Sequence, residues 1–171
     1  MIYFTADTHF GHKRTLELSR RPFNNTFLSD SAIIHRWTSV VRPTDTVYHL
    51  GDFGDVEVAP LLTGNVKFLP GNYDDETIVE ALQGHFEVIS PNTLFKYNTN
   101  VLQLVHEPDE AIPMGHFILF GHIHKLQMVK RNGLNVGVDC HNFTPISLET
   151  VLFYKNAIEN HYDENVFMET M

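Results

Sequence analysis

The chain has 171 residues and a mass of 19.7 kDa, and its 43% apolar and 19% charged residues fit one globular domain. A formal charge of −9 argues against the basic groove that long nucleic acid requires, although bound cations could still attract a small phosphorylated ligand. The single cysteine, Cys140, excludes an internal disulfide. The sequence shows no signal peptide, and no apolar run approaches the ~20 residues that a membrane span needs. We therefore expect a cytoplasmic protein, and its oligomeric state stays open.

The first half of the chain predicts strands that alternate with helices. Three short apolar runs read as buried strands: residues 2–6, 46–50 and 66–69. A helix is predicted over residues 29–43, capped by Ser29 or Asp30. A second helix is predicted over residues 75–84, with Gly84 as its C-terminal stop.

After residue 85 the pattern becomes mostly strand. Six apolar runs, with turn signals between several of them, are predicted as strands: residues 86–90, 93–98, 101–106, 116–122, 134–140 and 150–156. The order of elements predicts a layered α/β fold with mixed sheets, in a single domain over residues 1–171. Residues from about 156 to 171 turn polar, which indicates a loosely ordered C-terminal tail.

Polar side chains suited to metal binding follow the predicted strands where these end. They are two carboxylates, four imidazoles and an amide: Asp7, His9, Asp52, Asn72, His106, His122 and His124. In open α/β sheets, ligands bind outside the carboxyl ends of the strands. The set therefore suits two adjacent divalent cations that share one carboxylate.

Local spacing supports this interpretation. Asp7 and His9 stand at i and i+2, as do His122 and His124, and on an extended segment such side chains point the same way. The glycines before Asp52, Asn72 and His122 would permit sharp turns. Each piece alone has an ordinary explanation as a turn or a cap. Their order along the chain is what favours a metal site.

In order and spacing, these pieces resemble the calcineurin-like metallophosphoesterase family, of the small prokaryotic or phage type. The resemblance covers residues 1 to about 150 and rests on five motifs: Asp7-Thr8-His9, Gly51-Asp52-Phe53-Gly54-Asp55, Gly71-Asn72-Tyr73-Asp74, His106 and Gly121-His122-Ile123-His124. It implies a four-layered α/β/β/α sandwich with mixed sheets. It also implies a site for two divalent metal ions, most often manganese, with iron, zinc or nickel as alternatives.

The resemblance further implies how the ligands are shared. One cation would be held by Asp7, His9, Asp52 and His124. Asp52 would bridge to the second cation, which would also be held by Asn72, His106 and His122. A metal-bridging hydroxide would then attack a phosphorus ester in line.

The sequence departs from the family in the loop that usually reads GNHD, where Tyr73 replaces the histidine. A phenol donates a hydrogen bond but is a poor general acid, so we expect a diester or activated ester rather than a simple alkyl monoester. Alternatively, Tyr73 only packs at the rim of the site. His12 is a candidate substitute that would contact substrate, or else a surface histidine. Asp74 is either the retained partner in the loop or the N-cap of the 75–84 helix, and it can be both.

The sequence thus predicts a metal-dependent phosphoesterase, most simply a phosphodiesterase for a small nucleotide-like or activated ester. Besides the metal ligands, the candidate catalytic residues are Asp52, Asn72, Tyr73, Asp74 and His12. The alternatives are a catalytically weak binding or interaction module on the same fold, and a nuclease, which the missing basic groove disfavours. Arg20 and Arg21 are interpreted as a solvated basic patch rather than as phosphate contacts.

Overall fold

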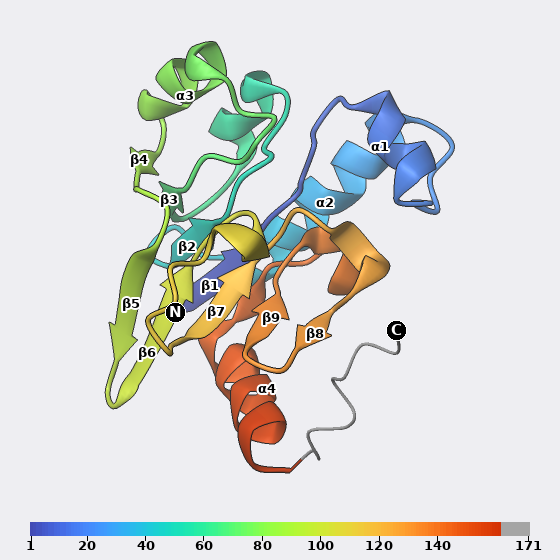
Figure 1. Cartoon of the computed structure of the whole chain (residues 1–171). Coiled ribbons are helices and arrows are strands. Elements are labelled where there is room, and N and C mark those ends of the chain that lie inside the picture. The colour runs from blue at the N-terminus through green and yellow to red at the C-terminus, as the bar shows by residue number, and fades with distance from the viewer. Residues whose placement is uncertain (162–171) are drawn as a thin grey trace.

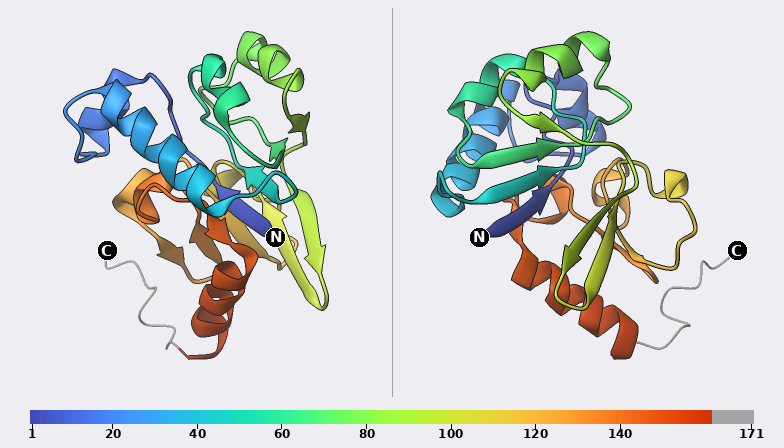
Figure 2. Two further views of the ribbon diagram at one scale, coloured as in Figure 1. Left: turned by 180° about the vertical axis from the view of Figure 1, so that it is seen from behind. Right: turned by 90° about the vertical axis from the view of Figure 1, so that its left-hand side faces the viewer.

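A computed structural model describes residues 1–161 and shows two five-stranded sheets that face each other (Figures 1 and 2). The first sheet has the order β10-β1-β2-β3-β4, with β1 at Ile2–Thr5, β2 at Thr46–His49, β3 at Asn65–Phe68, β4 at Glu87–Val88 and β10 at Ile146–Ser147. The second has the order β5-β6-β7-β9-β8, with β5 at Thr93–Tyr97, β6 at Asn100–Leu104, β7 at Phe117–Phe120, β8 at Val129–Lys130 and β9 at Gly133–Asn135.

Both sheets are mixed, and their parallel strands end at a common rim. In the first sheet β1, β2, β3 and β4 are parallel, and β10 is antiparallel to β1. In the second sheet β6, β7 and β9 are parallel, with antiparallel β5 and β8 at the edges. The loops that follow β1, β2, β3, β6 and β7 therefore meet at one rim of the sandwich, as expected for the carboxyl ends of parallel strands.

Four α-helices lie within the described residues: α1 at Lys13–Leu18, α2 at Thr26–Val40, α3 at Glu76–Gln83 and α4 at Leu148–Asn160. Helices α2 and α3 cover the outer face of the first sheet, where Trp37 and Leu82 are fully buried (Figure 2). Helix α4 packs on β1, β9 and β10 from the opposite side of that sheet. Among the helices of residues 1–161, none is long and apolar enough to cross a membrane.

The interior between the sheets is apolar. Phe4 of β1, together with Leu50 and Leu69 directly after β2 and β3, is fully buried against side chains of the second sheet, such as Leu102 and Leu119. Each such side chain contributes about 1.5–3 kcal/mol through its burial. The sandwich therefore gives the rim a rigid base, and the predicted α/β fold with two mixed sheets is confirmed.

Helix α2 ends at Val40, before the predicted end at residue 43, and its start also differs from the prediction. Helix α2 begins at Thr26, three residues before the predicted start, because the Asn25 side chain accepts a hydrogen bond from Leu28 N and caps it. Ser29 lies buried inside the helix, and Asp30 instead accepts a hydrogen bond from Gly11 N. Helix α3 and its end at Gly84 are confirmed.

The predicted strand at residues 150–156 is wrong, because this segment lies in α4. Ser147 caps the helix by accepting from Thr150 N, and Leu148, Val151 and Ile158 are buried along one face. The predicted strand at residues 134–140 is also too long, since β9 ends at Asn135 and a 3-10 turn follows at Val138–Cys140. Helix α4 takes in residues 156–160 of the predicted tail, and residues 162–171 of that tail lie outside the described residues.

Candidate metal centre

The seven predicted ligands converge on the rim, although they come from five separate loops. Two sets of ligand atoms each lie within 4.8 Å of one another: a first cluster of Asp7, His9 and His124, and a second cluster of Asp7, Asp52 and His106. Every residue of the two clusters is buried except His124, which is half-buried. Asp7 is common to both clusters, so the two sets form one continuous site.

Asp52 joins the two clusters through one oxygen. Its Oδ2 lies 3.3 Å from His9 Nε2 and 3.3 Å from His106 Nε2. Its Oδ1 accepts a hydrogen bond of 2.9 Å from Tyr73 N, which fixes the rotation of the carboxylate. A carboxylate oxygen between one histidine of each cluster has the position that a bridging ligand needs.

Asn72 and His122 extend the site beyond the second cluster. Asn72 Oδ1 lies 3.0 Å from both His106 Nε2 and His122 Nδ1. Neighbouring ligands at right angles around a cation, each about 2.1 Å from it, are separated by roughly 3.0 Å. The spacing of these nitrogen and oxygen atoms therefore fits a shared cation.

The second nitrogen of two of these histidines has a partner of its own. His106 Nδ1 lies 2.7 Å from Leu50 O, and His124 Nδ1 lies 2.7 Å from Asp139 Oδ2, so both Nδ1 atoms are assigned as donors. When these rings are neutral, this tautomer leaves Nε2 of each with a free lone pair. Metal-binding histidines have the same arrangement.

Two further atoms fit a cation. His9 Nε2 is buried and has no hydrogen-bond partner among the described residues. Asp7 is fully buried, and both of its carboxylate oxygens accept from His122 N, at 2.9 and 3.1 Å. Buried polar atoms are rarely left unpaired, so the orphaned nitrogen supports a ligand at this position.

The backbone of the site is strained in a recurrent way. Five of the predicted ligands have a left-handed backbone with positive φ: Asp7 (56°), His9 (45°), Asp52 (58°), His122 (68°) and His124 (48°). Non-glycine residues adopt this region rarely, and such strain gathers at functional sites. The expectation that the i and i+2 pairs lie on extended segments is therefore wrong, since left-handed turns after the strands aim these side chains.

The glycines beside the ligands act mainly by making room. Gly51 has φ +91° and is the sharp turn that was expected. At Gly121 φ is not positive, but a Cβ there would lie 2.7 Å from both Ala6 Cβ and Asp7 Oδ2. At Gly71 a Cβ would collide with Asp52. Two of the three glycines therefore let neighbouring loops approach closely rather than turn.

Burial and neighbouring charged groups shift the pKa values of Asp52 and His106 in opposite directions. Burial raises the pKa of Asp52, but the adjacent rings of His106 and His9 outweigh burial and bring this pKa below its usual value. Burial lowers the pKa of His106, but the Asp52 hydrogen bond and the Asp7 charge raise it to about 9. Burial raises the pKa of Asp7. Asp52 is therefore an ionised carboxylate at neutral pH, which is the form that binds cations.

Asp74 fastens two of the loops together. Its carboxylate accepts from Asp52 N (2.6 Å), Phe53 N (3.0 Å) and Gly71 N (2.8 Å). The N-cap of α3 is Asp75, which accepts from Ile78 N. Of the two interpretations of Asp74, the cap is thus wrong, and its contacts are those of a residue that joins the Asp52 and Asn72 loops.

Tyr73 and His12 lie beside the first cluster. The Tyr73 side chain is 50% exposed, and its ring meets those of His9 and His12 edge-on, with centroids 5.4 and 6.1 Å away. His12 Nδ1 lies 3.3 Å from His9 Nδ1. Burial, and then the proximity of His9, lower the pKa of His12, so its ring is neutral at neutral pH.

Two residues with contacts to this site were not predicted from the sequence. Arg21 is buried and pairs with Asp139, so its interpretation as part of a solvated patch is wrong. Asp139 in turn accepts from His124. The only sequence signal was a basic residue next to the exposed Arg20, and an acidic residue inside an apolar run.

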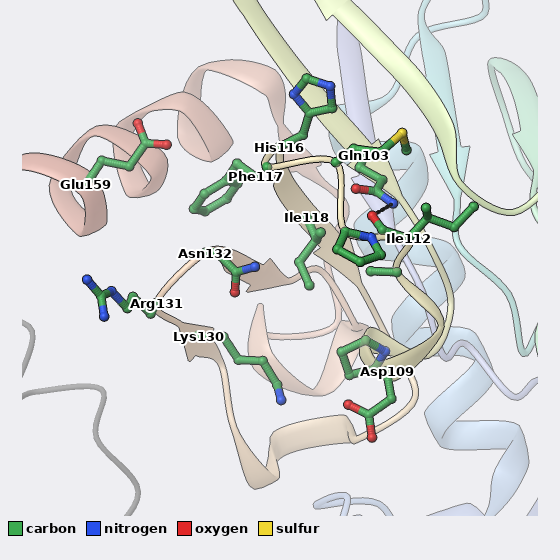
Figure 3. A pocket seen from close by; sticks show the side chains of 15 residues that line it. Gln103, Asp109, Ile112, His116, Phe117, Ile118, Lys130, Arg131, Asn132 and Glu159 are labelled. Carbon is green, nitrogen blue, oxygen red and sulfur yellow. Dashed lines mark hydrogen bonds between the residues drawn. The ribbon is translucent and has the colours of Figure 1, made fainter.

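Two of the cavities on the described surface bear on the location of the site. One of about 630 Å³ is lined by His122 and His124 together with Leu18, Arg20, Lys125 and Leu126. Another of about 520 Å³ is lined by parts of residues 103–118, the β8–β9 hairpin and Glu159 (Figure 3). None of the seven predicted ligands lines the second cavity. The cavity of about 630 Å³ adjoins the candidate metal centre, because His122 and His124 line it.

Comparisons with known proteins agree with this geometry. The calcineurin-like phosphoesterase superfamily domain matches residues 1–138. An uncharacterized protein of Methanocaldococcus jannaschii is 31% identical over 168 residues, which cover 88% of this chain and 89% of the relative. The Gene 66 protein of Mycobacterium phage L5 is 32% identical over 81 residues, which cover 42% of this chain and 39% of the relative.

A solved structure shares the fold. It is a protein of unknown function from Aquifex aeolicus, with a TM-score of 0.75 and 23% sequence identity, and the match covers 90% of this chain and 98% of that one. The family match takes in all seven predicted ligands, and the Methanocaldococcus relative extends it over most of the chain. This chain belongs to the calcineurin-like phosphoesterase superfamily.

Proposed function

We propose that this protein is a metal-dependent phosphoesterase with two divalent cations, most simply a phosphodiesterase for a small nucleotide-like or activated ester. The observation that carries the proposal is the position of Asp52 Oδ2, 3.3 Å from one histidine of each cluster. The orphaned His9 Nε2 and the histidine tautomers support the same assignment. Manganese is the proposed metal, with iron, zinc or nickel as alternatives.

Different residues of the chain would hold the two cations and contact the substrate. The first cluster together with Asp52 would hold one cation, and Asp52, Asn72, His106 and His122 would hold the other. When bound, such cations neutralise phosphate charge and make an attacking water more acidic. Tyr73 and His12 stand beside the first cluster, where a phenol or a neutral imidazole donates a hydrogen bond to a leaving oxygen.

A diester is favoured over an alkyl monoester for two reasons. Neither Tyr73 nor neutral His12 is a strong acid, and general acid help is worth roughly 10²–10⁴-fold for a poor leaving group. The cavity beside His122 and His124 also offers apolar surface from Leu18 and Leu126 for a second ester group. Arg20 and Lys125 line the same cavity, which suits an anionic substrate.

A small substrate is favoured over an extended polymer. With 21 acidic and 12 basic residues, the chain lacks the excess of positive charge with which proteins replace counterions along nucleic acid. A nuclease thus stays the second candidate, and steeply salt-dependent binding of DNA would favour it. The cytoplasmic location and the absence of membrane partners stay predictions from the sequence.

The experiment that tests the proposal is metal removal and reconstitution. After chelation, hydrolysis of bis-p-nitrophenyl phosphate should be lost, and added Mn²⁺ should restore it. In Asp52→Asn, hydrolysis should fall by more than the roughly 10–100-fold that loss of an outer-shell partner costs. Asp75→Asn is the matched control, since Asn caps α3 as well as Asp does. Absence of hydrolysis with every one of Mn²⁺, Fe²⁺, Zn²⁺ and Ni²⁺ would refute the proposal and favour a binding module.

A further inference from the structure

A buried ion pair stands directly behind the first cluster. Arg21 Nε and Nη2 donate to the two carboxylate oxygens of Asp139, at 2.9 and 3.1 Å. Both side chains are only 1% exposed. A buried pair loses hydration energy that its own attraction barely offsets, so its presence is weak evidence for stability alone.

The same guanidinium also holds the chain segment that contains Asp7. Arg21 Nη1 donates to Thr8 O at 2.9 Å, and Nη2 donates to Asp7 O at 2.6 Å. The planar fork of an arginine is suited to such fixed, multiple contacts. Arg21 therefore sets the distance between the Asp7 backbone and the carboxylate of Asp139.

Asp139 in turn fixes the ring of His124. Asp139 Oδ2 accepts from His124 Nδ1 at 2.7 Å, which leaves Nε2 of that ring for the first cluster. Asn135 Nδ2 donates to His124 O at 2.6 Å, so the backbone of the same residue is anchored too. The His124 side chain is 22% exposed, and without Asp139 its ring would have freedom to rotate.

We propose that Asp139, held in place by Arg21, is a positioning residue that orients His124 toward the cation of the first cluster. The contacts link both ends of that cluster, Asp7 and His124, which lie far apart in sequence. The second cluster has a different outer partner, Leu50 O behind His106, and has no contact with Asp139 among the described residues. The effect of Asp139 is therefore confined to one of two cations.

The test is cation binding to Asp139→Asn, measured by titration calorimetry with Mn²⁺ and by the absorption spectrum of the Co²⁺-loaded protein. One of two binding events should weaken by roughly 10–100-fold, and the other should keep its affinity. The Co²⁺ spectrum should change for that one ion only. This inference rests on the two cation sites of the proposed function.

Asp45→Asn is the matched control. Asp45 is a similarly buried carboxylate with the amino terminus and Arg42 N as partners, and it lies directly before β2, away from the rim. It should lose stability and keep both affinities. Arg21→Lys provides a second variant if Asp139→Asn does not fold, and the loss should affect the same cation.

The outcomes are distinguishable. If the wild-type protein binds no cation, the proposed function fails. If it binds two and Asp139→Asn binds both equally well, or weakens both by the same factor, the proposal for Asp139 is refuted while the proposed function stands. Wild-type affinity of Arg21→Lys for both cations would refute the link through Arg21.

Discussion

At the scale of single residues, Tyr73 takes the place of the histidine expected in the loop that contains Asn72 and Asp74. Its ring packs on His9 and His12, its backbone N–H fixes Asp52, and its side chain is half exposed. The backbone contact does not depend on the side chain, so any residue other than proline keeps it at this position. Substitutions of Tyr73 therefore test the phenol alone.

Tyr73→His should raise hydrolysis of a monoester with a poor leaving group, such as phenyl phosphate, relative to bis-p-nitrophenyl phosphate. General acid help spans roughly 10²–10⁴-fold, and we expect a gain near or below the lower end. The Asp74 carboxylate already accepts from three backbone N–H groups, which leaves it about one acceptor position with which to orient an introduced imidazole. The ratio of kcat/KM for the two substrates is the measurement.

Tyr73→Phe is the control for this prediction, because it keeps the ring contacts and removes only the hydroxyl. An unchanged rate on every substrate would mean that Tyr73 packs at the rim without a chemical role. An unchanged substrate ratio in Tyr73→His would show that the monoester chemistry is limited by something other than this residue.

At the scale of elements, close approach between loops shapes the site. Gly121, directly after β7, lies against Ala6 and the Asp7 carboxylate, which follow β1 of the other sheet. The two sheets thus meet at the rim through a residue without a side chain.

Gly121→Ala should disturb this contact. Its Cβ would lie 2.7 Å from Asp7 Oδ2, so the carboxylate must move. We expect overpacking to lower the free energy of unfolding by about 1–3 kcal/mol and the cation affinity to weaken about tenfold or more.

Gly84→Ala is the control, since the nearest contact of its Cβ would be 3.6 Å away and its φ is −69°. It should leave affinity unchanged, and equal affinities in the two variants would contradict the role of Gly121. Calorimetry with Mn²⁺ and urea unfolding measure both effects.

Elements also show what the sequence could predict. The apolar runs at residues 46–50 and 66–69 have no competing interpretation, and the polar residues after them identify the rim. The run at residues 150–156 is rich in β-branched and aromatic residues, which favour strands, yet Ser147 caps it and its buried positions recur at helical spacing. The Arg21–Asp139 pair could not be predicted, because its partners are 118 positions apart and meet only through tertiary packing.

At the scale of the whole molecule, stability depends on a histidine that must stay neutral. His49, at the end of β2, is fully buried and lies against Trp37, Phe53 and Phe68. Thr8 Oγ1 donates to Phe53 O, so it accepts from His49 Nε2 at 3.0 Å. His49 Nδ1 is buried without a partner among the described residues, and a proton there would have no acceptor.

The core under the rim should therefore become a source of acid sensitivity. Burial, followed by repulsion from His106, lowers the pKa of His49 from 6.5 to about 3. Between pH 6.5 and about 3, His49 is protonated in the unfolded chain and neutral in the folded chain. The His49 contribution is thus complete above pH 6.5, and the free energy of unfolding falls as pH falls toward 3, by about 1.4 kcal/mol per pH unit.

Urea unfolding of the chelator-treated protein between pH 7.5 and 4.5 measures this dependence. His49→Phe should be less sensitive to pH than the wild type by about 1.4 kcal/mol per unit below pH 6, whatever its stability at pH 7.5. His85→Phe removes an exposed histidine and should keep the wild-type slope. Since other groups such as His106 also bind protons differently in the folded and unfolded states of all three proteins, only the difference between slopes isolates His49. Parallel slopes for His49→Phe and the wild type would mean that the folded core accepts the proton after all.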